Sequence, residues 1–352
     1  MVSRATYAQS HQRRFRRWLS NRRIDVAAVH QTLIAQSLSQ WGNDRIYLSL
    51  DTTMVWNCFC IVWVGVVYRG RTVPIAWRIV AQSSSTVRLW TIQRVLRQAA
   101  RVMPKEVSVV LLADRGFADG KLMKYLRENL KWHFRIRIKR SFQFQFQGKW
   151  HKVSSVKLPI GQAYFTPVVA VGKTKPFAGV YLAFAHDKLS NEDWVIVSDE
   201  PTTLQTFAQY RLRFCVEETF LDLKSNGFNL EASRLRDKFA LTQLCGVIAL
   251  TMLFLVLQGT QVVASGKRRF VDSHWNRGMS YLKLGWNWIR LAITKQWKIH
   301  LFRFLSGASD PQPAMASKRQ HNQSFNREFT VCQVTMPLSG DDSAVGGFDE
   351  QL

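Results

Sequence analysis

The chain has 352 residues, 47% of them hydrophobic, which favours a folded protein of two or three domains and excludes a disordered chain. Its 49 Lys and Arg against 24 Asp and Glu give a net charge of +25, which indicates a polyanionic partner, with nucleic acid favoured over an anionic membrane surface. Five cysteines lack the spacing of a metal finger, and no signal peptide opens the chain. Structural zinc is therefore not expected. The protein is expected in a reducing cytoplasm.

Residues 1–44 are predicted to form a basic arm of two helices with a break at Asn21. The first helix surrounds Phe15 and Trp18 with arginines, namely Arg13, Arg14, Arg16 and Arg17. Such a helix is suited to contact the DNA backbone or a groove. A solvated surface helix is the alternative.

Residues 45–138 are predicted as the first part of a ribonuclease H-like core, because their elements follow the order strand, strand, strand, helix, strand, helix. A turn at Arg69-Gly70 makes a hairpin of the second and third strands, and Asp119 is expected to cap the last helix. The predicted strands are 45–51, 58–70, 71–80 and 106–114, and the predicted helices are 83–101 and 120–129.

Residues 139–200 are predicted as an all-β insertion, because strand-like sequence is broken there repeatedly by Gly and Pro. The repeat FQFQFQ alternates with period two and so places its aromatic rings on one face. The apolar strand DWVIVSDEP ends the insertion, and the core is expected to resume over residues 201–265. The fold class is thus α/β, a ribonuclease H-like core interrupted by an all-β insertion, with helical N- and C-terminal parts.

The stretch YRLRFCVEETFLDLK, residues 210–224, contains neither Gly nor Pro and has apolar residues at helical spacing. Steps of three, four and seven residues return to one face of a helix, so four polar side chains share that face: Tyr210, Arg213, Glu217 and Lys224. A solvated face with one Glu-Arg pair is the alternative.

Residues 239–264 contain no charge and pass the length test for a membrane span. Three Gln, three Thr and two Gly dilute the stretch, so a buried helix is predicted and no membrane is expected. Residues 266–306 are expected to form a basic, aromatic, helical region. Residues 307–352 are polar and end acidic, which predicts a disordered tail.

Three carboxylates are candidates for one site. Asp51 and Asp114 each end a predicted strand, and Glu217 lies on the helix that could cover the same edge. Three like charges this close need cations between them, and oxygen donors favour Mg²⁺ or Mn²⁺, typically two ions that activate the nucleophile and stabilise the leaving oxygen of a phosphodiester. Glu218 and Asp222 are rivals on other faces of the helix, and lone acidic residues at strand ends are often turn formers.

The helix also carries a family resemblance. Tyr210, Arg213, Glu217 and Lys224 reproduce without a gap the Y-x2-R-x3-E-x6-K signature of the DDE transposases in the insertion sequence four group, which cut and paste bacterial mobile DNA. LDTT at Asp51 and ADRGF at Asp114 are similar to the first and second acidic motifs of that family. The resemblance covers about residues 45–240.

This resemblance implies a metal-dependent enzyme that nicks the ends of its own element, forms a DNA hairpin and joins the ends to target DNA. It implies that Asp51, Asp114 and Glu217 bind the metal ions. Tyr210, Arg213 and Lys224 would contact phosphates of the element end, and Trp194 would stack on a flipped base. The implied partners are the terminal inverted repeats, target DNA and a second copy of the chain, in the bacterial cytoplasm at the nucleoid.

Other hypotheses stay open from the sequence. A ribonuclease H-like nuclease would hydrolyse nucleic acid without strand transfer, and a catalytically inactive remnant would only bind DNA. Trp194 could instead be an ordinary core residue on a buried strand.

Overall fold

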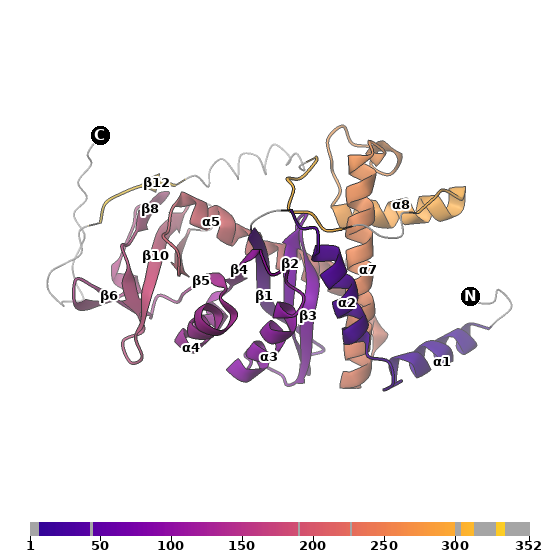
Figure 1. Cartoon of the computed structure of the whole chain (residues 1–352), viewed down its shortest axis with the longest axis horizontal. Helices are drawn as coiled ribbons and strands as arrows, with labels where there is room; N and C mark the ends of the chain where they lie inside the picture. The colour runs from indigo at the N-terminus through magenta and orange to yellow at the C-terminus, as the bar shows by residue number, and fades with distance from the viewer. Residues whose placement is uncertain are drawn as a thin grey trace.

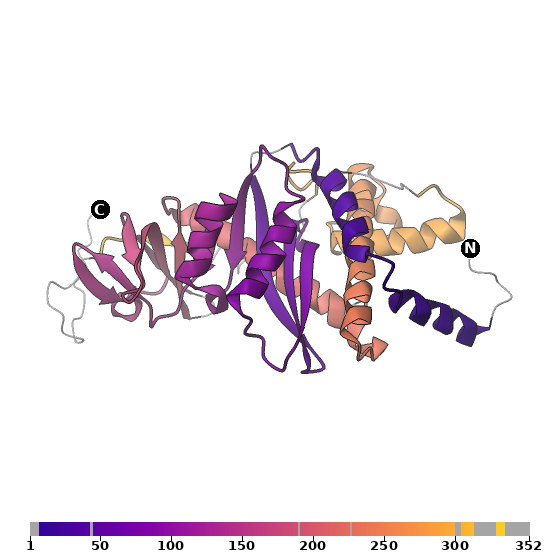
Figure 2. The ribbon, with the colours of Figure 1, turned by 60° about the horizontal axis from the view of Figure 1, so that its bottom comes forward.

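The computed structural model describes residues 7–42, 45–188, 191–225, 227–299, 304–312 and 329–334. Within these ranges, twelve strands form one mixed sheet in the order β3-β2-β1-β4-β5-β11-β10-β9-β6-β7, with β8 beside β10 and β12 beside β8. Figure 1 shows the sheet running from β3 in the middle of the molecule to β6 at one end, with α7 and α8 at the other end. In Figure 2, α3 and α4 lie across one face of the sheet.

The first half of the sheet matches the predicted strand order. β1 pairs antiparallel with β2 and parallel with β4, and β4 pairs parallel with β5. Arg69 and Gly70 have φ angles of 51° and 76°, the left-handed backbone that a two-residue hairpin turn requires. All but one residue of β2 are buried, as expected when both faces of a strand are covered. The bounds are β1 (Arg45–Val55), β2 (Phe59–Tyr68), β3 (Arg71–Ala81), β4 (Ser108–Ala113) and β5 (His133–Arg137).

Most predicted helices are present, with shifted ends. The helix expected over 83–101 begins only at Leu89, and the one after Asp119 passes from α-helix into a π-helical segment at Tyr125. Asp119 caps that helix as predicted, because its carboxylate accepts hydrogen bonds from the Lys121 and Leu122 amides. The helices before α5 are α1 (Ala8–Leu19), α2 (Val26–Leu38), α3 (Leu89–Ala100) and α4 (Gly120–Lys124).

The uncharged helix α7 (Lys238–Ala264) is long and apolar enough to cross a membrane, by length and composition only. It packs instead against β3, α2 and α8 (Tyr281–Lys295), and two thirds of its most apolar window is buried inside the protein. Gly259 on α7 faces Gly285 on α8, and a Cβ at either position would overlap a backbone carbonyl of the other helix. The stretch therefore forms a core helix, as predicted.

The β-rich region does not form a separate sheet. β11 pairs antiparallel with β5, so the strands expected as an insertion continue the central sheet. The physical reason is that the edge of β5 needs a hydrogen-bonding partner, and β11 supplies it. The bounds are β6 (Gln143–Phe146), β7 (Lys149–Lys152), β8 (Gln162–Phe165), β9 (Val169–Val171), β10 (Phe177–Asp187) and β11 (Glu192–Ser198).

The C-terminal expectations need two corrections. Among the described residues of the region expected to be helical, α8 is the α-helix. Residues 266–280 form a loop that contains one 3-10 turn. The Asp272 carboxylate holds this loop together, because it binds the Arg268 side chain and the Gly278 amide. The tail expected to be disordered contributes the strand β12 (Thr330–Val331), which pairs parallel with β8. Phe329 is buried against Phe207, with ring centroids 5.1 Å apart. The pairing of β12 with the edge of β8 places this apolar ring in the core. Residues 313–328 and 335–352 of the tail lie outside the described ranges.

Candidate active site

Asp51 and Asp114 occupy matching positions on two neighbouring parallel strands. The register of β1 and β4 ends with Leu50 opposite Ala113, so the next residue on each strand is an aspartate. The adjacency predicted from the sequence is confirmed. Asp51 does not end its strand, however, because β1 continues to Val55 in its pairing with the hairpin partner β2.

The helix expected over residues 210–224 is divided into three segments. α5 (Leu204–Arg211) is followed by a 3-10 turn, Leu212–Phe214, and then by α6 (Cys215–Lys224). Thr203 opens α5 with a capping box that it shares with Thr206. Arg213 lies in the 3-10 turn and Glu217 lies four residues later on α6, a spacing at which side chains meet.

The buried guanidinium of Arg213 links the helix to the sheet. Its Nη1 donates to Oδ2 of Asp51 at 3.2 Å, and its Nη2 donates to Oε1 of Glu217 at 2.7 Å. The Arg213 side chain is 7% exposed, whereas that of Glu217 is 54% exposed. The guanidinium also lies 4.5 Å from the ring centroid of Phe214. Two of the three candidate carboxylates are therefore held by one internal cation.

Electrostatics tie the third carboxylate to the same site. Burial raises the pKa of Asp51 to about 6, while the Thr52 amide and the charge of Arg213 act to lower it. The charges of Asp114 and Glu217 both raise the pKa of Asp51 further. Asp51 therefore lies close enough to Asp114 and to Glu217 to be repelled by both, and its surroundings favour positive charge.

A divalent cation fits the donor chemistry but not the present arrangement. Carboxylate oxygens are the ligands that Mg²⁺ and Mn²⁺ prefer. Among the described residues, however, no three Asp, Glu, His or Cys side chains are grouped so that they could hold a metal ion. Asp51, Asp114 and Glu217 are therefore not grouped as a metal site in this structure, and Arg213 binds two of the three.

The rival carboxylates on α6 have a different partner. Asp222 accepts a hydrogen bond from Nε of Arg71 at 2.6 Å, and Glu218 lies 3.6 Å from the same guanidinium. Arg71 belongs to β3, so these side chains point away from Asp51. This geometry supports Glu217 as the third carboxylate.

Three of the residues expected to contact DNA are buried in the protein. Tyr210 packs edge-on against Trp194, which is 4% exposed and also contacts Phe214. Burial raises the pKa of Tyr210 above its usual range. Arg213 is buried as described, and Lys224, at the end of α6, is half-buried. Trp194 thus lies in the core in this conformation, and its role as a base acceptor stays a prediction.

The basic arm lies at a distance from the β-rich end. Helix α1 is at the opposite end of the molecule in both ribbon views (Figures 1 and 2). Its four candidate arginines are exposed, namely Arg13, Arg14, Arg16 and Arg17. The arm is therefore accessible to a partner, and a DNA contact by it stays a prediction.

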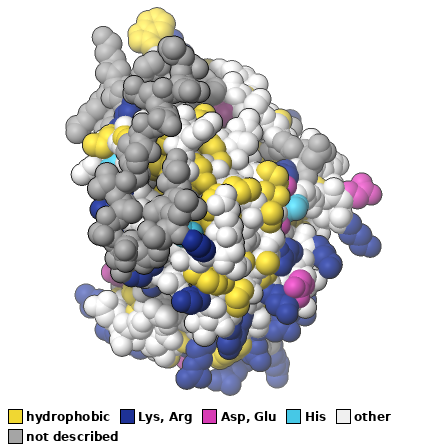
Figure 3. Space-filling view, turned by 90° about the vertical axis from the view of Figure 1, so that its left-hand side faces the viewer, with side chains coloured by type: hydrophobic (Ala, Val, Ile, Leu, Met, Phe, Trp, Pro, Cys, Tyr) yellow, Lys and Arg dark blue, Asp and Glu magenta, His cyan; other side chains and the backbone are white. Residues whose placement is uncertain are grey.

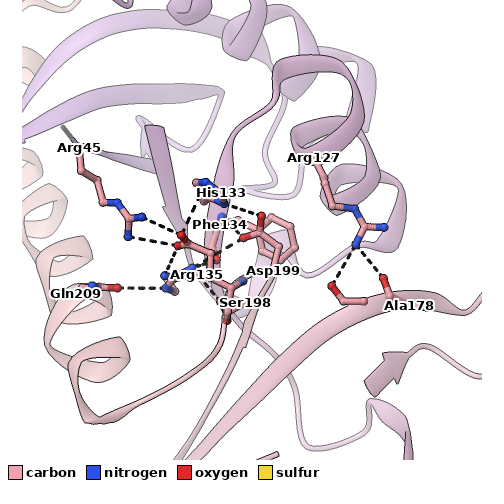
Figure 4. A network of polar contacts seen from close by, with 11 residues as sticks. Arg45, Arg127, His133, Phe134, Arg135, Ala178, Ser198, Asp199 and Gln209 are labelled. Carbon is pink, nitrogen blue, oxygen red and sulfur yellow. Dashed lines mark hydrogen bonds and ion pairs between the residues drawn. The ribbon is translucent and has the colours of Figure 1, made fainter. Parts of the chain in front are cut away.

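A polar network that was not predicted from the sequence connects β5 to α5 and to the segment before it (Figure 4). Arg135 on β5 donates to Glu200 at 2.6 Å, to Ser198 at 2.9 Å and to Gln209 on α5 at 3.2 Å. Arg45 at the start of β1 also binds Glu200. Burial acts to raise the pKa of Glu200, but Arg135, His133 and Arg45 together hold it below its usual range. Arginines alternating within an apolar strand, as in HFRIRIK, are the one signal that could have revealed the network.

A basic hollow of about 680 Å³ adjoins the carboxylate edge. Figure 3, a view of the β-rich end, shows Lys and Arg gathered along the lower part of that face. The hollow begins at Arg115, the residue after Asp114, and contains acidic residues only at Glu192 and Asp193. Its cationic lining consists of Arg115, Arg137, Lys139 and Arg140. Positive charge beside the carboxylates suits a polyanionic substrate.

Comparison with known proteins identifies the family. Residues 64–254, more than half of the chain, match the family model described as "Transposase DDE domain". The chain therefore belongs to the DDE transposases. The matched segment includes Asp114 and Glu217 and begins after Asp51. No curated protein sequence matches the chain.

One similar solved structure is described as "Cryo-EM structure of piggyBac transposase synaptic complex with hairpin DNA". The TM-score is 0.41 and the sequence identity 11%, over 95% of this chain and 67% of that one. This likeness is too low to support a conclusion about the chain.

Proposed function

We propose that this DDE transposase catalyses cut-and-paste transposition of its own insertion sequence and belongs to the insertion sequence four group. Two observations support the proposal: Asp51 and Asp114 follow matching residues of the neighbouring parallel strands β1 and β4, and Arg213 links Asp51 to Glu217 on α6. The order β3-β2-β1-β4-β5, with three antiparallel and two further parallel strands, supports a ribonuclease H-like core. The signature spacing from Tyr210 to Lys224 supports the group.

One or two Mg²⁺ or Mn²⁺ ions would be held by three carboxylates, those of Asp51, Asp114 and Glu217. Such ions, when bound, activate a water or hydroxyl nucleophile and stabilise the leaving oxygen of a phosphodiester. The protein supplies three carboxylates on rigid elements, and Asp51 must be ionised to serve as a ligand. The network around Arg135 binds Glu200 before α5 and Gln209 near its end, so it holds α5 against β5, and α5 leads directly into the turn that carries Arg213.

The DNA partners are proposed from charge. The net charge of +25, the exposed arginines of α1 and the basic hollow beside Asp114 all favour phosphate contacts. We assign to these surfaces the terminal inverted repeats and target DNA, with Lys224 as a phosphate contact at the site. Two ends cut in concert need two active sites, so a homodimer in the synaptic complex is part of the proposal, as is a bacterial cytoplasmic location.

The test uses the DNA that flanks the gene. Short inverted repeats found there would be placed on labelled duplexes, and Mg²⁺-dependent nicking, hairpin formation and strand transfer would be measured. Asp51→Asn, Asp114→Asn and Glu217→Gln should abolish cleavage but keep DNA binding, because they remove cation ligands and not phosphate contacts. Glu218→Gln, on the same helix, is the matched control and should stay active.

Two outcomes would contradict the proposal. Cleavage without strand transfer of pre-cut ends would identify a nuclease. Tight DNA binding without metal-dependent cleavage would identify an inactive DNA-binding protein.

A further inference from the structure

We infer that Arg213 is an internal counter-ion that competes with divalent cations for the carboxylate site. The guanidinium holds one oxygen of Asp51 and one oxygen of Glu217, so a cation can take these two oxygens only when Arg213 moves away from them. The inference rests on the proposed function only in taking Asp51 and Glu217 as cation ligands.

Competition follows from the contacts. Arg213 engages Oδ2 of Asp51 through one nitrogen and Oε1 of Glu217 through the other. A cation coordinated by these oxygens and the guanidinium bound to them would be two positive charges at the same two oxygens, and like charges at such close range repel each other.

Arg213 is suited to exchange partners. Its Nε is buried and has no hydrogen-bond partner among the described residues, so one donor of the guanidinium is unused. The residue belongs to the 3-10 turn between α5 and α6, not to the interior of a regular α-helix. A guanidinium fork binds a phosphate as well as it binds a carboxylate.

The exchange couples two binding events. If a cation displaces Arg213 from both carboxylates, a buried guanidinium is left without a counter-charge, which is costly. A phosphate of the DNA backbone would relieve that cost, so cation and DNA binding should each strengthen the other. Cations are thereby kept from the site until DNA is bound.

The experiment measures Mn²⁺ binding to the free protein by the electron paramagnetic resonance signal of unbound Mn²⁺, at a pH of about 8, where carboxyl groups are ionised. Arg213→Gln should bind Mn²⁺ at least about fivefold more tightly than the wild type. Asp51→Asn in the Arg213→Gln background should remove the gain. Circular dichroism checks that each variant is folded.

Arg268→Gln is the matched control. Arg268 is also a buried arginine paired with a carboxylate four residues later, at 3.1 Å from Asp272, but it belongs to the loop before α8. Its replacement should leave the affinity for Mn²⁺ unchanged. An equal gain in both variants would reflect only the loss of one positive charge and would overturn the inference.

Equal affinities of the wild type and Arg213→Gln would also overturn the inference, while the proposed function would stand. If neither the wild type nor Arg213→Gln binds Mn²⁺, the chain has no cation site here, and both the inference and the proposed function are wrong. If Arg213→Gln does not fold, the affinity for Mn²⁺ is measured on Arg213→Lys instead. The single ammonium of lysine cannot hold both carboxylates as the two guanidinium nitrogens do. Tighter binding than the wild type supports the inference, and equal binding refutes it.

Discussion

The indole ring of Trp194 packs edge-on against the phenol ring of Tyr210, with ring centroids 5.9 Å apart. This contact joins β11 to α5 beside the carboxylate site. Trp194 is 4% exposed, so truncating it should leave a cavity. Trp194→Ala should therefore lower the free energy of unfolding by about 3 kcal/mol, measured by urea denaturation. Trp275→Ala is the control, because Trp275 is 83% exposed, and its effect should stay within about 0.5 kcal/mol.

The same variant tests the base-receiving role. If Trp194 is only a core residue, Trp194→Ala should reduce nicking and hairpin formation together. Normal nicking with loss of hairpin formation, partly restored by an abasic site at the flipped position, would show that the ring receives a base.

Asp51 should make stability depend on pH. Its pKa is raised from 3.8 to about 6 in the folded protein, chiefly by burial. As pH rises, Asp51 loses its proton in the unfolded chain at a lower pH than in the folded protein. The free energy of unfolding therefore falls as pH rises from about 4 to about 6. Asp51→Asn should escape this loss, and its stability relative to the wild type should rise by up to about 3 kcal/mol between these pH values. Parallel urea midpoints for the two proteins across this range would contradict the raised pKa.

The network at Arg135 should matter greatly for stability. Arg135→Met leaves the carboxylates of Asp199 and Glu200 without their buried partner, which should cost about 3 to 5 kcal/mol in urea denaturation. Lys124→Met is the control, because Lys124 and Glu128 form an exposed pair at 3.8 Å that should contribute less than about 1 kcal/mol. Equal effects of the two substitutions would mean that the network does not anchor α5.

The C-terminal strand should contribute to folding. Phe329→Ala removes a ring packed on Phe207 and should cost about 3 kcal/mol. Val331→Ala, at an exposed position of the same strand, should change the free energy of unfolding by no more than about 0.5 kcal/mol. Unchanged stability of Phe329→Ala, or of a chain truncated before it, would show that the tail is dispensable, as its polar composition alone suggests.

The basic arm should determine much of the salt dependence of DNA binding. Replacing Arg13, Arg14, Arg16 and Arg17 with alanine should flatten the plot of log affinity against log salt by about 0.9 for each DNA phosphate that the arm no longer neutralises. A fluorescence titration at several salt concentrations measures this slope. The control for the change in net charge replaces four other exposed arginines together, namely Arg88, Arg94, Arg97 and Arg101. An unchanged slope in the arm variant would place the DNA elsewhere, for example along the basic hollow.

Local sequence rules were sufficient for many elements. Strands β1 to β4 were predicted from runs of β-branched and aromatic residues, and the Arg69-Gly70 turn from a glycine between two such runs. Asp119 was identifiable as a cap because a cap acts on its own helix. The spacing from Tyr210 to Lys224 predicted one helix, but a 3-10 turn at Leu212–Phe214 separates α5 from α6.

Tertiary structure decided everything that depends on which element lies beside which. The pairing of β11 with β5 joined the expected insertion to the central sheet, and an open edge on β8 took up β12 from the tail. Arg213 carries a signature that indicates phosphate binding, yet in the folded chain its nearest anions are Asp51 and Glu217. A sequence gives the donors of a side chain, but burial and the charges that folding brings near it determine which acceptor those donors bind.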